Sequence, residues 1–304
     1  MIKKYIKLES MYMKYTGKTQ RPNMKYILRK AYKYIFIVPR VAIRALFRKF
    51  IDYTPNTHLH KFVFVCGLHR SGTSVLHRLI QENDRVSGIS GTTVPEDEGQ
   101  FLQDIYPADN EYGILFANHS EVHIDEKSNL VNSNNKLKLL KSWGRYWDFS
   151  KDILIEKSPS NIVRTAFLQQ MFTDSIFIII TRHPIVASLA VQKWTSEPLD
   201  KIVEHWFVAH EIFMKDAEKL DKYIVVRYED LINKTDETLL AVFDLIGVEF
   251  IESKERFIDH NKKYFDKFTT EYDRKYLAHL DEKYTHILDL YGYSLTPNFV
   301  TQDK

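Results

Sequence analysis

Short runs of consecutive apolar residues recur along the chain, and each is followed by a segment whose apolar residues repeat at helical spacing. The runs are Phe62–Cys66, Ile153–Ile155, Ile176–Ile180 and Tyr223–Val226. Unbroken runs rich in β-branched and aromatic residues predict strands buried on both faces, as in a parallel sheet. Helices are expected from Thr73, from Ser160 as N-cap to about Phe172, from Pro184, and over Asp200–Lys219, Asp236–Ile246 and 264–293. The alternation predicts an α/β fold, with a central parallel sheet flanked by helices.

The stretch Lys61–Asn83 joins a predicted strand, a glycine-bounded loop and a helix start. Gly67 and Gly72 bound the loop, and Thr73 and Ser74 open the helical pattern. The first amides of a helix have no acceptor within it, and the helix macrodipole is positive at that end. The stretch therefore predicts an anion site.

The loop has the spacing of a phosphate-binding P-loop, Gly67-x4-Gly72-Thr73-Ser74, with one change. A nucleotide triphosphatase carries a lysine for the β- and γ-phosphates where this chain has Thr73. Arg70, inside the loop, supplies a planar fork that can bind two oxyanions at once. We predict a phosphate ligand without triphosphate and Mg²⁺ chemistry; the alternative is an ordinary strand–turn–helix.

Other chemistry-bearing residues follow the predicted strands. Arg182 comes after Ile176–Ile180, where a P-loop triphosphatase would be expected to carry a metal-binding aspartate. The arginine favours an anion, although a surface ion pair is the alternative.

Three consecutive acids, Glu96, Asp97 and Glu98, precede an apolar pair at Phe101. They could occupy the first turn of a helix, where the dipole favours negative charge. One of them could instead be the general base for an acceptor hydroxyl. The residues alone leave both interpretations open.

Residues 104–150 carry no repeat and no clear motif. Their tyrosine, tryptophan, histidine and asparagine content suits a substrate-lining insertion or long surface connections. His119 and His123 lie four residues apart, but no third metal ligand is evident. No metal is predicted.

The charge of the chain is unevenly distributed. Of the 304 residues, the first 60 hold 14 Lys/Arg and 2 Asp/Glu, a net charge of +12, and the remainder has −9. We divide the chain into a basic, partly helical extension, 1–57, and one domain, 58–304. The extension could pack on the acidic body or lie on an anionic membrane surface; no nucleic-acid partner is expected.

The compartment is predicted from what the sequence lacks. No apolar run is long enough for a transmembrane helix or a signal peptide. Cys66 is the one cysteine, so no internal disulfide can form. We expect a cytoplasmic protein, with peripheral membrane contact as an option.

Four motifs in order support a family resemblance. CGLHRSGTS, IEKSPSN, FIIITRHPIVASLAVQKW and VRYEDL resemble those of the sulfotransferases, in the broad branch that includes tyrosylprotein and bacterial carbohydrate enzymes, over about residues 60–250. The resemblance implies a P-loop NTPase-like three-layer fold and the cosubstrate 3′-phosphoadenosine 5′-phosphosulfate (PAPS), without a metal.

The resemblance also implies roles for individual residues. The 5′-phosphosulfate would be held by five consecutive residues, Arg70, Ser71, Gly72, Thr73 and Ser74. Arg182 would hold the 3′-phosphate, Tyr228 would approach the nucleotide, and Lys157 would neutralise charge on the transferring group. Glu98, with Glu96 second, would be the base.

One position departs from the family pattern. A serine is usual eight residues after the arginine at the strand end, and this chain has Ala190 there. Ser188 could substitute for it, and Lys262 or Lys263 could assist at the 3′-phosphate.

We therefore expect a metal-free, in-line sulfuryl transfer to a hydroxyl, with a glycan or glycolipid as the first choice of acceptor and a peptidyl tyrosine as the second. Arg70→Ala and Lys157→Ala should each abolish most transfer and leave folding intact. The alternatives are a P-loop nucleotide or small-molecule kinase and a catalytically weakened nucleotide-binding partner protein.

Overall fold

The structure is a computed structural model that describes residue 43 and the ranges 59–255, 257–273 and 275–296. The predicted basic extension, 1–57, lies outside these residues apart from Ile43. Within the described ranges, no helix has both the length and the apolar character needed to cross a membrane.

The core of the fold is a sheet of five parallel strands in the order β2-β3-β1-β4-β5. The strands, in chain order, are β1 Lys61–Gly67, β2 Val86–Gly88, β3 Ile153–Lys157, β4 Ile176–Thr181 and β5 Tyr223–Arg227. The predicted α/β fold with a central parallel sheet is confirmed. The short edge strand β2 was not predicted, because it is not one of the apolar runs in the sequence.

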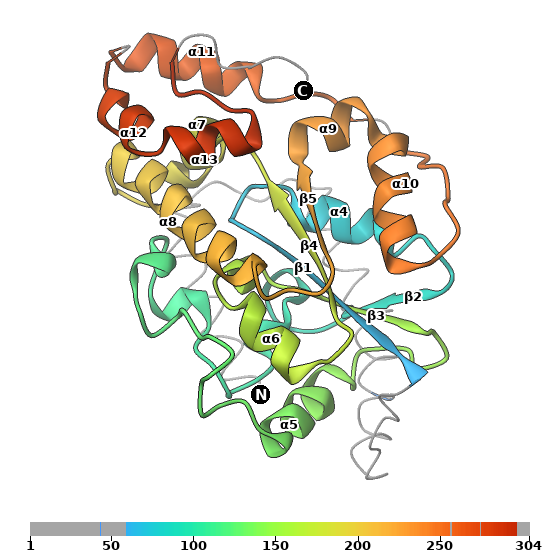
Figure 1. The fold of residues 1–304 in the computed structure, drawn as a ribbon. Coiled ribbons are helices and arrows are strands. Elements are labelled where there is room, and N and C mark those ends of the chain that lie inside the picture. The colour runs from blue at the N-terminus through green and yellow to red at the C-terminus, as the bar shows by residue number, and fades with distance from the viewer. Residues whose placement is uncertain (1–42, 44–58, 256, 274, 297–304) are drawn as a thin grey trace.

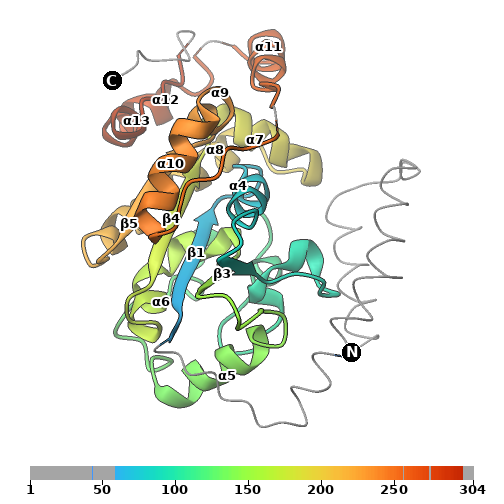
Figure 2. The same cartoon turned by 90° about the vertical axis from the view of Figure 1, so that its right-hand side faces the viewer.

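Helices cover both faces of the sheet, which gives three layers (Figure 1). One face carries α4 Thr73–Ile80, α9 Tyr228–Asn233 and α10 Thr235–Ile246. The other carries α5 Ser133–Trp143, α6 Thr165–Met171, α7 Pro184–Val191 and α8 Leu199–Ala217. Three further helices gather at one end of the molecule in Figures 1 and 2, namely α11 Lys262–Glu271, α12 Ala278–Lys283 and α13 Thr285–Tyr291.

The central strand β1 is apolar without a break because helices cover it on both faces. Phe62 and Phe64 pack into the cluster under α5 and α6, whereas Val63 and Val65 face the cluster under α4 and α10. All four side chains are at most 3% exposed. Both faces of the strand are buried, so polar alternation is absent.

The helix boundaries agree with the sequence signals at most sites. Helix α7 begins at Pro184, and α10 ends at Gly247, whose φ of 76° is the left-handed conformation that favours glycine. The prediction for Ser160 was wrong. It lies inside a short 3₁₀ helix, Pro159–Val163, and α6 begins only at Thr165.

Candidate active site

A cavity of about 1010 Å³ opens at the carboxyl ends of the strands. Its walls come from the loop after β1, the start of α4, the irregular segment 95–119, and the residues that follow β3, β4 and β5. Parallel strands bring their carboxyl ends to one edge of a sheet, so residues far apart in sequence meet there.

The loop after β1 is shaped for an anion. Arg70 and Gly72 both have positive φ, 68° and 105°, and α4 begins directly after them, at Thr73. The Ser71 hydroxyl is buried, and no described residue hydrogen-bonds to it. A buried hydroxyl without a partner inside a loop that ends at a helix N-terminus fits an oxyanion ligand.

Tyr228 packs against the loop from the end of β5, which is separated from β1 by β4 in the sheet. A Cβ on Gly72 would lie 2.6 Å from Cδ2 of Tyr228, so the ring packs against the bare backbone of the loop. Tyr228 is the first residue of α9, directly after β5. Tyr228 lines the cavity beside the loop, and that it approaches the nucleotide stays a prediction.

Arg182 joins three segments at the end of β4. Its Nη2 and Nε donate to Oδ1 of Asn261, at 2.6 and 3.0 Å, and its Nη1 donates to the Arg70 carbonyl at 3.0 Å. The guanidinium lies 4.1 Å from the centre of the Tyr228 ring. Burial lowers its pKa from the ordinary value, against the opposing effects of Tyr228 and Glu229. The side chain is only 6% exposed but lines the cavity, so it is a fixed cation beside the loop.

Ser188 does not reach the same cavity. It is buried in α7 and borders a separate small space near Trp206, and Ala190 is buried as well. The structure therefore does not bring Ser188 together with the other predicted residues.

Two lysines lie around Tyr264: Lys263, which was predicted to assist at the 3′-phosphate, and Lys193, which was not predicted. The Nζ of Lys193 is 3.4 Å from the Tyr264 hydroxyl, and the Nζ of Lys263 is 5.1 Å from the centre of the Tyr264 ring. Burial raises the pKa of Tyr264, but Lys193, Lys263 and Arg70 together bring it below the ordinary value. Lys262 instead pairs with Asp266 at 3.5 Å and is highly exposed. Lys193 lies within the quoted motif FIIITRHPIVASLAVQKW, in the short 3₁₀ helix Gln192–Trp194, but the sequence analysis assigned it no role.

Lys157 and Glu98 form a buried ion pair beside the cavity. The Lys157 Nζ, at the end of β3, lies 2.9 Å from Oε1 of Glu98, with side-chain exposures of 1% and 7%. Gln100 Nε2 donates to the other oxygen of Glu98 at 2.7 Å. Burial raises the pKa of Glu98, and Lys157 opposes that rise.

The other two acids of the cluster have different surroundings. Glu96 is exposed, lines the cavity, and has a φ of 50°. Asp97 accepts hydrogen bonds from the amide and the hydroxyl of Thr92. Glu96 and Asp97 sit in a one-turn 3₁₀ helix, Pro95–Asp97, so the helix-start interpretation holds for them only in this short form. Glu98 is the acid that faces Lys157.

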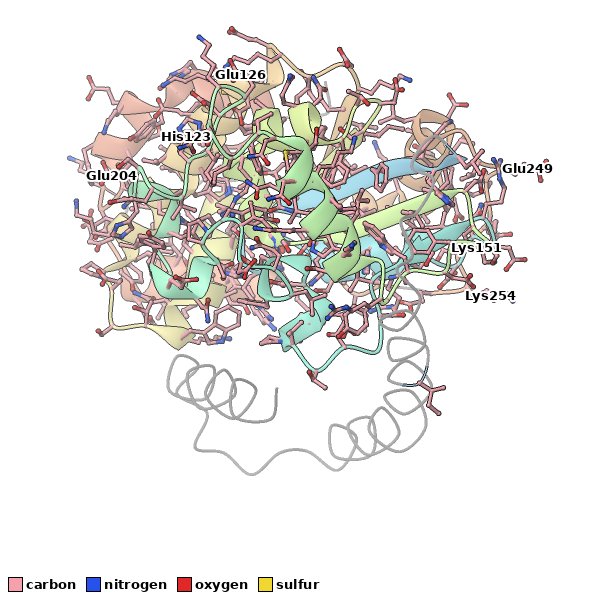
Figure 3. All side chains as sticks on the ribbon, turned by 90° about the horizontal axis from the view of Figure 1, so that it is seen from below. His123, Glu126, Lys151, Glu204, Glu249 and Lys254 are labelled. Atoms are coloured by element: carbon pink, nitrogen blue, oxygen red, sulfur yellow. The ribbon has the colours of Figure 1, made fainter. Side chains whose placement is uncertain are left out.

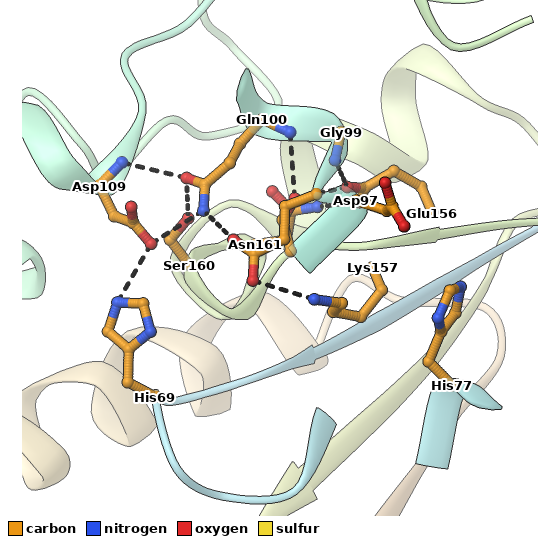
Figure 4. Close-up of polar contacts among 12 residues, drawn as sticks. His69, His77, Asp97, Gly99, Gln100, Asp109, Glu156, Lys157, Ser160 and Asn161 are labelled. Carbon is orange, nitrogen blue, oxygen red and sulfur yellow. Dashed lines mark hydrogen bonds and ion pairs between the residues drawn. The ribbon is translucent and has the colours of Figure 1, made fainter. Parts of the chain in front are cut away.

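Glu156 anchors the segment that carries Glu98. Its Oε1 accepts from the Gly99 amide at 2.8 Å and the Ser158 hydroxyl at 2.5 Å, and its Oε2 accepts from Asn161 at 2.6 Å (Figure 4). Burial raises the pKa of Glu156 to about 7, and the donors Ser158 and Gly99 partly offset this rise.

His69 and Asp109 form a second pair, which the sequence analysis also missed. His69 Nε2 lies 3.2 Å from Oδ2 of Asp109, and both residues line the cavity. Gln100 links the two pairs, because its Nε2 also donates to Oδ2 of Asp109 at 2.9 Å (Figure 4). Ser160 donates to Oε1 of Gln100 at 2.8 Å, which is the structural use of the residue predicted as an N-cap. Asp109 lies in the segment without motifs, so only the fold places it here.

His119 and His123 do not come together as ligands. His119 lines the cavity, whereas His123 Nε2 lies 3.7 Å from Asp216 Oδ1, on the side of the molecule where Figure 3 shows Glu126. The described residues contain no group of three or more metal-ligating side chains.

Comparison with known proteins gives a family. A model described as "Sulfotransferase family" matches residues 63–252, more than half of the chain. No curated protein sequence matches the chain.

Several solved structures align with this chain at low identity and with TM-scores under 0.5. Sulfotransferase STF1 from Mycobacterium tuberculosis H37Rv is 14% identical, with 93% of this chain and 92% of that chain covered and a TM-score of 0.47. STF9 from Mycobacterium avium is 13% identical, with 94% and 96% covered and a TM-score of 0.47. A sulfotransferase from Alicyclobacillus acidocaldarius is 12% identical, with 76% and 96% covered and a TM-score of 0.44.

Proposed function

This chain belongs to the sulfotransferase family, and we propose that it transfers the sulfuryl group of PAPS to the hydroxyl of a glycan or glycolipid. The observation that carries the proposal is a loop that lacks the P-loop lysine and contains Arg70, together with the buried cation Lys157, which pairs with Glu98 on the wall of the same cavity.

The residues around the loop fit the phosphosulfate end of the donor. The first amides of α4, the unpaired Ser71 hydroxyl and the Arg70 guanidinium can each donate to its oxygens. Gly72 leaves no room for a side chain under Tyr228, so the ligand would meet backbone there. These residues, with Thr73 and Ser74, would hold the donor.

The 3′-phosphate would lie near Arg182. We propose that Lys193 and Lys263 act in place of the serine hydroxyl that the family pattern has at the position of Ala190, since both ammonium groups flank Tyr264, and Arg182 lies 5.9 Å from the same ring. Ser188 points into a different space and has no part in this proposal.

The reacting centre would use Lys157 and a proton acceptor. Charge develops on the bridging oxygen of the leaving nucleotide, and preorganised cations stabilise it. Lys157 and Arg70 are suited to this. The resemblance assigns the base to Glu98, with Glu96 second, and such a base contributes about 10²–10⁴-fold.

The rest of the cavity favours a sugar over an acidic peptide. Phe101, Tyr112 and Trp194 offer aromatic rings, and Glu96 and Glu197 put negative charge on the lining. Among the described residues that line the cavity, Arg70 and Arg182 are the sole lysine or arginine side chains, and both belong to the donor side. A tyrosine with acidic neighbours would therefore meet repulsion, and peptidyl tyrosine stays the second choice.

Ligand-induced stabilisation tests the donor. We expect adenosine 3′,5′-bisphosphate to raise the unfolding temperature, and ATP–Mg²⁺ to leave it unchanged. The reverse result would favour the kinase alternative. Labelled PAPS with a panel of glycans, glycolipids and tyrosine peptides then tests the acceptor; nucleotide binding without transfer to any of them would favour a catalytically weakened binding protein. Cytoplasmic location and membrane contact through 1–57 stay predictions.

A further inference from the structure

His69 carries no role in the donor site, yet it is the best placed proton acceptor in the cavity. We propose that His69, oriented by Asp109, takes the proton of the acceptor hydroxyl, and that Glu98 instead holds Lys157 in position. This inference rests on the proposed function and specifies its chemistry.

The pairing with Asp109 leaves one ring nitrogen of His69 free. An ionised carboxylate only accepts hydrogen bonds, so Nε2 carries the proton that faces Asp109 Oδ2 at 3.2 Å. No described residue hydrogen-bonds to Nδ1, which Figure 4 shows on the ring edge away from Asp109. Since the side chain is 18% exposed and lines the cavity, Nδ1 can meet a substrate hydroxyl.

The ring is also held in place by its neighbours. Phe116 and Trp194 contact it edge-on, with ring centres 5.9 and 6.1 Å away. Asp109 is fixed in turn, because Gln100 donates to its carboxylate and accepts from its amide at 3.0 Å. A nucleophile-activating base needs this arrangement, in which a third group orients it.

Glu98 is less suited to the same task. Both of its oxygens already accept hydrogen bonds, one from Lys157 and one from Gln100. Taking a proton would leave the buried Lys157 ammonium without its counter-charge, which is costly. As a carboxylate, Glu98 pairs with the Lys157 ammonium and holds it in position next to the cavity wall.

The acceptor oxygen forms a bond to sulfur, while the bond from sulfur to the bridging phosphate oxygen breaks and leaves its electron pair on adenosine 3′,5′-bisphosphate. The hydroxyl proton moves to Nδ1 of His69, and the imidazolium then releases a proton to water.

The charged groups around His69 determine its pH response. Burial lowers its pKa, but Asp109 more than offsets this, with Glu98 adding to the rise and Lys157 opposing it, so that the pKa ends above the ordinary value. His205, packed nearby on α8, is neutral because burial lowers its pKa to about 3. His69 therefore becomes an available base only as the pH rises through its elevated pKa, and kcat/KM should fall on the acid side.

The test is the pH profile of kcat/KM for transfer from PAPS in four full-length variants. We expect His69→Gln to lower kcat/KM by about 10²–10⁴-fold and to abolish the acid limb, that is, the fall of kcat/KM on the acid side of the profile. Asp109→Asn should move the limb to lower pH, because it removes the charge that raises the pKa of His69. Glu98→Gln should be slower but keep the limb. His279→Gln, an exposed histidine on α12, should match the parent enzyme.

The outcomes separate this inference from the proposed function. A limb retained in His69→Gln, or abolished in Glu98→Gln, would overturn the inference while transfer by the parent enzyme upholds the function. Absence of transfer together with no stabilisation by adenosine 3′,5′-bisphosphate would overturn both. Stabilisation by that nucleotide is measured in every variant, so a misfolded protein is recognised; if His69→Gln fails to fold, the shift of the limb in Asp109→Asn decides.

Discussion

The loop Gly67–Ser74 and the segment 95–119 line the same cavity but are built differently. The loop is a contiguous motif between β1 and α4, and its reactive groups are backbone amides, a hydroxyl and the exposed Arg70. The segment has only one-turn 3₁₀ helices, and it places its acids through buried hydrogen bonds to distant residues such as Glu156 and Lys157.

This difference means that the two walls should respond differently to mutation. A change in the loop removes an interaction with the ligand and leaves the protein interior as it was. A change in the buried network around Glu98 leaves a charge or polar group without its partner, which costs stability as well as activity. Mutations that separate ligand binding from stability therefore test the comparison.

Between the two walls, the largest combined effect on transfer and stability is expected at Lys157. Lys157→Met keeps most of the side-chain volume but removes the cation, so we expect transfer to fall by about 10²–10³-fold. Since Lys157 is 1% exposed, Glu98 is then left unpaired, and the free energy of unfolding should drop by about 3 kcal/mol. This revises the expectation from sequence that substitution here leaves folding intact. Chemical denaturation and transfer assays measure the two effects.

The double variant Lys157→Met/Glu98→Gln is the matched control. With both charges removed, most of the lost stability should return, whereas transfer should stay low. Recovery of transfer in the double variant would show that Lys157 serves only to compensate Glu98.

Arg70 provides the corresponding test on the loop. Arg70→Ala should lower transfer by about 10²-fold and weaken stabilisation by adenosine 3′,5′-bisphosphate, because a fork on the oxyanions is lost. The unfolding temperature without ligand should stay the same, since Arg70 is exposed. Arg70→Lys keeps the charge but not the fork, and should recover only part of the activity. A destabilised Arg70→Ala would contradict the contrast between the two walls.

The same contrast explains which residues of the candidate site could be predicted from the sequence. The loop, Lys157 and Arg182 could be predicted because they lie in or directly after apolar runs, and parallel strands collect their ends at one edge. Of the predicted residues, eight line the cavity, and they are Arg70, Gly72, Thr73, Ser74, Glu96, Glu98, Arg182 and Tyr228.

The missed residues depend on packing between distant segments. Asp109 meets His69 only because Gln100 and Ser160 fix the segment 95–119 against the end of β3. Helix α5 was not predicted because it lies in the region without motifs, 104–150, and buries only Leu139, Leu140 and Trp143. No local pattern encodes such contacts.

Two glycines offer a matched comparison of smaller size. A Cβ at Gly72 would meet the Tyr228 ring at 2.6 Å, and one at Gly99 would meet Glu156 Oε1 at 2.5 Å. We expect Gly72→Ala to weaken nucleotide binding about tenfold, from the clash and the positive φ of this position. Gly99→Ala should lower turnover about tenfold and leave nucleotide binding unchanged, because it displaces the network that holds Glu98. Titrations with adenosine 3′,5′-bisphosphate and steady-state kinetics distinguish them, and equal effects on nucleotide binding would remove the distinction.

The smallest expected effect is the pH dependence of stability from Glu156. Burial raises its pKa from 4.5 to about 7 in the folded state, so the folded protein binds this proton more tightly than the unfolded chain does. The resulting stability is fully present below pH 4.5 and is lost as the pH rises to about 7. Glu156→Gln cannot titrate, and its amide also mismatches the donor Asn161, so it should be less stable than the parent at low pH. The difference in unfolding free energy between the parent and Glu156→Gln should narrow by an amount on the order of 1 kcal/mol between pH 5.5 and 7. Denaturation at a series of pH values measures it, and a constant gap would mean that Glu156 stays ionised throughout, held by its three donors.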